Sequence, residues 1–185
     1  PWFFISNGIR GVASGFVDYS YLLKKTVFNP RVIPIVRAVS ALYSHMIFLS
    51  IVIAALALCG LKLTTLLCLI PYLAVLCLFV YAVGRVLSPL CVLCKDIFSV
   101  LSVLLNIGFW LTPVFWNIEN LNGPVKTIVW LNPATIIVEG YRQALIFGKC
   151  VSADKIAYLF GLCVAFLLIG TVADKRLLPD LSDKM

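Results

Sequence analysis

Residues 63–84 read LTTLLCLIPYLAVLCLFVYAVG, a run of 22 residues without a charged side chain between Lys62 and Arg85. At 1.5 Å per residue, an α-helix of this length extends about 33 Å, enough to cross about 30 Å of bilayer hydrocarbon. Three further runs have the same character: 38–61, 97–118 and 156–173, of 24, 22 and 18 residues. None alternates as the strand of a β-barrel does. The pattern predicts an all-α fold, a polytopic transmembrane helix bundle.

The composition of the 185-residue chain also indicates a lipid environment. Apolar residues make up 62% and charged residues 12%, against roughly 45–50% and about 25% in soluble domains. The net charge of +7 would suggest a nucleic-acid partner for a soluble chain. Basic residues beside apolar spans are, however, typical of membrane proteins. We therefore predict a membrane protein without a nucleic-acid partner.

The first 23 residues form a weaker span candidate because they contain Arg10 and Asp18. Since the chain begins at Pro1, we expect these residues to be the remainder of an earlier, more polar span. The basic residues predict the orientation. Ten Lys and Arg residues lie before residue 38, in the 85–96 loop or in the C-terminal tail, against five in the alternate loops. This bias places the 18–37 segment, the 85–96 loop and the C-terminus in the cytoplasm.

The 119–155 connection is expected on the outer side and has helical features of its own. Residues 124–131 predict one or two apolar turns, and Asn132-Pro133 offers an N-cap followed by proline at the first helical position. A helix ending before Gly148 would have about 15 residues and be too short to span. We predict a short re-entrant helix pair in which Glu139 and Arg142 share a face. An interfacial pair with a surface ion pair and a role at a pore mouth both remain open.

Few side chains in this sequence could carry chemistry. The single histidine, His45, lies inside the 38–61 run without a nearby carboxylate, so a structural hydrogen bond between helices is favoured over a functional role. Most of the seven cysteines lie in apolar runs, where free cysteine behaves as a small hydrophobe, and no disulfide framework is expected. We predict no catalytic, cofactor-binding or metal-binding residue.

Residues 21–34, YLLKKTVFNPRVIP, form a basic and apolar segment between two spans. Its expected short helix is broken by Pro30, and Pro34 is well placed to begin the next helix. Such a stub could enter the groove of a soluble partner. A solvated loop in contact with lipid is the alternative.

Several stretches, in order along the chain, resemble the ABC-2 type permeases that export polysaccharides and polyol phosphates, namely the O-antigen, capsule and teichoic acid exporters. The matching stretches are Pro1–Phe4, Leu23–Pro34, Cys94–Ile97, Phe109–Val114, and Leu131–Pro133 running into Glu139–Arg142. One departure is Asn29, where many members have proline directly after the phenylalanine.

The resemblance implies a six-span permease that works as a homodimer with two copies of a separate ABC ATPase, which would bind ATP and Mg²⁺. Residues 1–185 would form a single domain from the second span onward, in the plasma (inner) membrane of a bacterium. The substrate would be a lipid-linked polysaccharide or a teichoic acid-like polymer. The implied ATPase-coupling loop comprises Leu23, Lys24, Lys25, Val27, Phe28, Pro30 and Arg31. The implied outer re-entrant helices contain Asn132, Pro133, Glu139 and Arg142.

Aromatic side chains suit the path of such a polymer, because ring faces contact the C–H faces of sugars without demanding one hydrogen-bond pattern. The first candidates for lining a channel are Trp2, Phe109 and Trp110, although aromatic residues at span ends also form interfacial belts facing lipid. An ABC-2 exporter of drugs or lipids is an alternative function. A membrane-embedded glycosyl or acyl transferase is another, but it would need positioned acids and bases that the sequence does not display.

Overall fold

The computed structural model describes residues 1–23, 29–60, 63–94, 96–149 and 152–184, and within these ranges the chain is helical and contains no strand. The elements are α1 (Trp2–Asp18), α2 (Ser20–Leu23), α3 (Val32–Leu58), α4 (Leu63–Leu93), α5 (Asp96–Leu111), the 3₁₀ turn η1 (Ile118–Asn120), α6 (Pro124–Leu131), α7 (Pro133–Leu145) and α8 (Ala153–Lys184). The predicted all-α class is confirmed.

Three of the predicted spans are confirmed as long apolar helices. In α3, α4 and α8, the stretches Val32–Leu58, Leu66–Leu93 and Ala153–Leu177 are long and apolar enough to cross a membrane. The prediction for residues 97–118 was too long, since α5 has 16 residues and ends at Leu111. Pro113 explains this end, because proline disfavours helical geometry at the residue before it and lacks an N–H donor.

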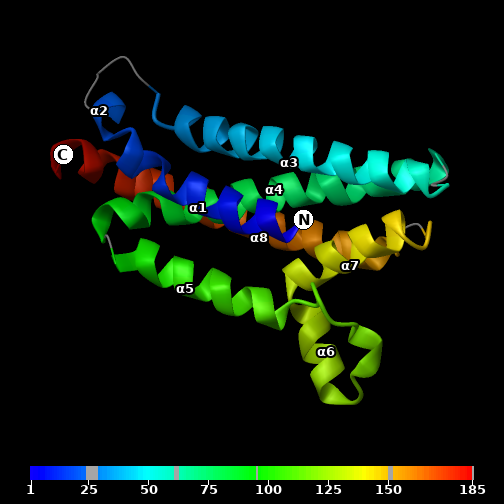
Figure 1. Cartoon of the computed structure of the whole chain (residues 1–185). Helices are drawn as coiled ribbons and strands as arrows, with labels where there is room; N and C mark the ends of the chain where they lie inside the picture. Colours follow the sequence, from blue (N-terminus) through cyan, green and yellow to red (C-terminus); the bar gives the residue numbers. More distant parts are fainter. Residues whose placement is uncertain (24–28, 61–62, 95, 150–151, 185) are drawn as a thin grey trace.

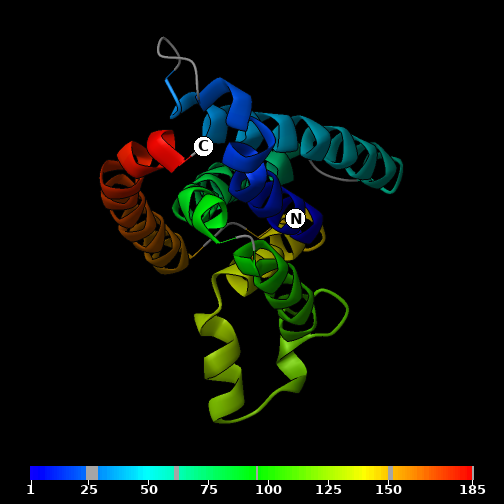
Figure 2. The ribbon, with the colours of Figure 1, turned by 90° about the vertical axis from the view of Figure 1, so that its left-hand side faces the viewer.

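The helices α1 and α4 lie side by side at the centre of the bundle, with α3 packed mainly on α1 and α8 on α4 (Figures 1 and 2). The helix α1 has the weakest sequence signal of a span, yet Ile5, Val12 and Phe16 are almost fully buried. Contact with α4 is close: a Cβ built on Gly84 would lie 2.5 Å from Cβ of Val12. The helix α1 therefore packs at the centre of the bundle although its composition is the least typical of a span.

The connections between the helices lie at two opposite ends of the bundle. The helix α2, the end of α4 and the C-terminus lie at one end, whereas the end of α3 and the start of α8 lie at the other (Figure 1). Gly60, with φ of +88°, follows the end of α3 in a turn. The helix α6 projects sideways from the bundle beyond the end of α5 (Figure 2).

An ion pair joins α4 to α8. Both Nε and Nη2 of Arg85 donate to Oδ2 of Asp174, at 2.8 and 2.6 Å. The side chain of Asp174 is 3% exposed and that of Arg85 is 15% exposed. The pair thus holds two opposite charges within the packed region between the helices.

The cysteines differ in part from the expectation. Cys59, Cys77, Cys91, Cys94 and Cys163 are free thiols. Cys68, near the start of α4, is disulfide-bonded, so the expectation of no disulfide was wrong for this residue. A buried position in an apolar run does not distinguish a free cysteine from a bonded one, because the bond depends on which other segment packs there.

Candidate functional site

The short helices after α5 are placed as the sequence predicted. The helix α6 ends at Leu131, and Asn132 then caps α7 by accepting a hydrogen bond from the N–H of Ala134 at 3.0 Å. Pro133 occupies the first position of α7, where its missing N–H has no consequence. The Nδ2 amide of Asn132 also donates to Oγ1 of Thr112 at 3.3 Å, which links the start of α7 to the end of α5.

The predicted pairing of Glu139 and Arg142 is confirmed. Nη1 of Arg142 donates to Oε2 of Glu139 at 2.7 Å, and Nε2 of Gln143 donates to Oε1 at 2.8 Å. Glu139 is 6% exposed, so its carboxylate is buried rather than at the surface. Nη2 of Arg142 donates to the carbonyl oxygens of Pro113 and Val114, at 2.6 and 3.2 Å. One side chain therefore joins α7 to the chain that follows α5.

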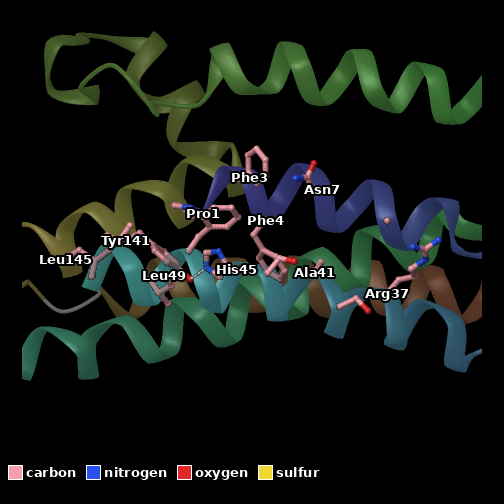
Figure 3. A pocket seen from close by; sticks show the side chains of 15 residues that line it. Pro1, Phe3, Phe4, Asn7, Arg37, Ala41, His45, Leu49, Tyr141 and Leu145 are labelled. Carbon is pink, nitrogen blue, oxygen red and sulfur yellow. Dashed lines mark hydrogen bonds between the residues drawn. The ribbon is translucent and has the colours of Figure 1, made fainter. Parts of the chain in front are cut away.

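A groove of about 690 Å³ lies between α1, α3 and α7 (Figure 3). Its walls combine aromatic rings with polar side chains, including Phe3, Asn7, Ser44 and Phe48. Arg37 lies at one end and Tyr141 and Leu145 at the other. Among the described residues, the side chains of Asn7 and Ser44 have no hydrogen-bond partner. Their polar groups are therefore free to form hydrogen bonds with a ligand in the groove.

His45 forms the floor of this groove together with α7. Its Nε2 atom lies 3.2 Å from the hydroxyl of Tyr141, and the two share a hydrogen bond. The imidazole stacks on the ring of Phe4 with centroids 4.8 Å apart. The predicted structural hydrogen bond between helices is thereby confirmed, and it connects α3 to α7 while the stacking connects α3 to α1.

The three aromatic residues predicted to line a channel lie together at the start of α1 and the end of α5. The ring of Trp2 lies 5.9 Å from that of Phe109, and Phe109 lies 5.6 Å from Trp110. Phe115 joins the same cluster at 5.5 Å from Phe109. Trp110 is 75% exposed, so the cluster presents a broad aromatic surface next to the first turn of α1.

The implied coupling loop falls only partly within the structure. Lys24, Lys25, Val27 and Phe28 lie outside the described residues. Leu23 is the last residue of α2, whereas Pro30 and Arg31 directly precede α3, where the N–H of Arg31 donates to Oδ1 of Asn29 at 3.1 Å.

The helices α1 and α3, which lie before and after α2 and this segment along the chain, are tied together. The guanidinium of Arg37 in α3 pairs with Asp18 at the end of α1 and lies 4.8 Å from the ring centroid of Tyr19. The bundle therefore holds both sides of the segment in place.

The groove residues Asn7, Ser44 and Phe48 were missed by the sequence analysis. A signal was present, because Ser40, Ser44 and Phe48 follow one another at intervals of four and so share a face of α3. A hydroxyl-bearing stripe on an otherwise apolar span marks a face turned toward protein or water rather than lipid.

The long apolar helices, the buried ion pairs and the short non-spanning helices define a polytopic helical membrane protein. The chain belongs to the ABC-2 type transporter family, whose model matches residues 3–146. It is 24% identical over 170 residues to the O-antigen export system permease protein RfbA of Myxococcus xanthus, a match that covers 90% of this chain. The matched region is 65% of the length of that relative.

Proposed function

We propose that the chain is the membrane-embedded transport subunit of an ATP-driven exporter of a lipid-linked polysaccharide or teichoic acid-like polymer. The groove between α1, α3 and α7 carries the proposal, because the hydroxyl groups of a glycan cannot be left in hydrocarbon without hydrogen-bond partners. Asn7 and Ser44 offer such partners, while Phe3 and Phe48 offer ring faces. The family supports a transport function, and the similarity to an O-antigen export permease favours a polysaccharide as the substrate.

In the proposed assembly, a second copy of the chain covers the groove. We therefore include a homodimer in the proposal, with the cluster of Trp2, Phe109 and Trp110 extending the aromatic surface of the path. An ABC ATPase would dock at residues 23–31, and we expect that ATPase to bind the ATP and Mg²⁺. ATP binding can shift the permease between conformations only if the ATPase contacts this segment differently in each.

The function is tested in the organism's own cells with the natural full-length protein. Replacing Ser44 by leucine removes a hydroxyl and fills the groove, so we expect surface polysaccharide to fall by about tenfold or more, equivalent to about 1.4 kcal/mol. Lipid-linked polymer should accumulate inside the cell. The matched control is Ile51→Ala on α3, a 60% exposed position outside the groove, which should leave export unchanged. Unaltered surface polysaccharide after deletion of the gene would overturn the proposed function.

The proposed location is the plasma (inner) membrane of a bacterium, with the C-terminus in the cytoplasm. Disulfides persist in oxidising compartments outside the cytoplasm, and Cys68 is disulfide-bonded near the start of α4. This supports an outward-facing position for that end of the bundle. The end that contains α2 and the C-terminus would then face the cytoplasm, in agreement with the distribution of Lys and Arg.

Two exposed free thiols at opposite ends of the bundle test the orientation. Cys59 follows α3 and Cys94 follows α4. In spheroplasts, a membrane-impermeant maleimide should label Cys59 without lysis and Cys94 only after the membrane is opened. Mass spectrometry of the labelled peptides gives the result, and Cys59→Ser and Cys94→Ser variants assign each signal. Labelling of Cys94 before lysis, with Cys59 protected, would reverse the orientation.

A further inference from the structure

The helix α5 lies on the side of the bundle from which α6 projects (Figure 2). Of its 16 residues, only Leu101 and Leu105 are buried, and the helix contacts α1 and α4. Its exposed side carries large apolar residues, among them Val103, Leu104 and Ile107, which are 51–60% exposed. Most of the surface of α5 is therefore open to lipid or to another protein chain.

Asn106 places an amide on this open surface. The side chain is exposed and makes no hydrogen bond to any described residue, whereas the hydroxyl of Ser102 donates to the carbonyl of Phe98 at 3.0 Å. At 1.5 Å per residue, Asn106 lies about 15 Å from the start of α5 and about 8 Å from its end, within the depth of the hydrocarbon. An amide at this depth is unfavourable unless its donors and acceptor have partners. Lipid tails offer none.

The residues around Asn106 suit close contact with a second helix. Ser99, Ser102 and Asn106 follow one another at intervals of three and four, so they share one face of α5. Leu101 and Leu105 lie on a different face, the one that is buried. Small residues let helix backbones approach closely in a membrane, and asparagine forms hydrogen bonds across such contacts. The face of Asn106 therefore fits another helix that offers a polar group at the same depth.

We propose that Asn106 forms a hydrogen bond with Asn106 of a second copy of this chain, so that the two α5 helices pack against each other. A two-fold axis along the membrane normal keeps each residue at the same depth in both copies, and the contact between copies is self-complementary. An amide matches its own copy because it carries both donors and an acceptor. A charged side chain at this position would instead face its own charge. The inference rests on the homodimer of the proposed function and names its contact.

Cysteine cross-linking of the natural full-length protein in isolated membranes tests which face meets the second copy. With copper phenanthroline as oxidant, Asn106→Cys should give several-fold more disulfide-linked dimer on a non-reducing gel than Leu104→Cys. Leu104 is the matched control, because it is also exposed but points about 160° away around α5 from Asn106. The unsubstituted protein, treated identically, gives the background from its own thiols.

The contribution of the amide is measured by energy transfer between fluorescent-protein fusions of the full-length protein in liposomes, at several ratios of protein to lipid. Asn106→Leu should raise the dimer dissociation constant by about threefold or more, equivalent to about 0.6 kcal/mol, a typical value for a hydrogen bond between membrane helices. Asn106→Gln keeps the amide and should retain most of the affinity. Misfolding of the leucine variant would leave the cysteine pair to decide.

Each other outcome overturns the proposed contact. An unchanged dissociation constant for Asn106→Leu, with equal cross-linking at residues 104 and 106, would place the interface elsewhere and leave the homodimer standing. A monomeric natural protein would remove the homodimer as well. Labelling of Asn106→Cys by a membrane-impermeant maleimide, without cross-linking, would show that this face lines water. The export of surface polysaccharide, measured in the same cells, tests the transport function separately.

Discussion

Replacing Asp174 by alanine should lower the free energy of unfolding by about 3–5 kcal/mol, as expected when one partner of a buried ion pair is removed. The variant leaves the guanidinium of Arg85, which is 15% exposed, between α4 and α8 without its carboxylate. Its two hydrogen bonds at 2.8 and 2.6 Å are lost together. Denaturant unfolding of the purified protein in detergent micelles measures the effect.

A double variant separates the charge from the packing. Arg85→Met combined with Asp174→Leu removes both charges, so most of the lost stability should return, because apolar replacements of buried ion pairs are often neutral. Asp154→Ala on the same helix is the control, since Asp154 is exposed and its effect should stay within about 1 kcal/mol. Equal losses for Asp174→Ala and Asp154→Ala would show that the ion pair does not hold α8 in place.

A side chain at residue 140 should separate α7 from α4. A Cβ built on Gly140 would lie 2.1 Å from Cε1 and 2.2 Å from Cζ of Tyr72, whose side chain is buried in the core. Gly140→Ala should therefore cost about 1–3 kcal/mol, as typical overpacking does, and Gly140→Val more. Thermal unfolding of each variant in the same detergent gives the comparison.

The control for Gly140 is a glycine with open space around it. A Cβ on Gly161 of α8 would meet no atom within 4 Å, so Gly161→Ala should leave stability unchanged or raise it by up to about 1 kcal/mol. Replacing Tyr72 by leucine in the Gly140→Ala background removes the ring that blocks the new methyl group, and part of the stability should return. A harmless Gly140→Ala would contradict the tight contact between α4 and α7.

The long helices could be predicted because spanning length depends on local composition alone. Two of the errors at their ends share one cause. The charge-free runs were taken to end before Arg85 and before Asp174, yet α4 continues to Leu93 and α8 to Lys184. These two residues are partners, 89 positions apart. Each charge neutralises the other, so a helix can continue through them, and no local pattern reveals the pairing.

The candidate site also has one part that could be predicted from the sequence and one part that could not. The cap at Asn132 and the pair of Glu139 with Arg142 were predictable, because their partners lie within four residues along the chain. The groove was not, since it depends on α1, α3 and α7 meeting. The hydrogen bond between His45 and Tyr141 joins residues 96 positions apart, and helical periodicity does not specify which helices become neighbours.

The contacts of Arg142 limit how the side of the protein that contains α6 can move. Its guanidinium holds the carbonyls of Pro113 and Val114 and the carboxylate of Glu139 at once. Asn132 makes a further link to Thr112 at the other end of α7. A rotation of α7 must therefore carry the end of α5 with it. We therefore expect α7 and the end of α5 to move together as one unit in any opening on this side of the protein.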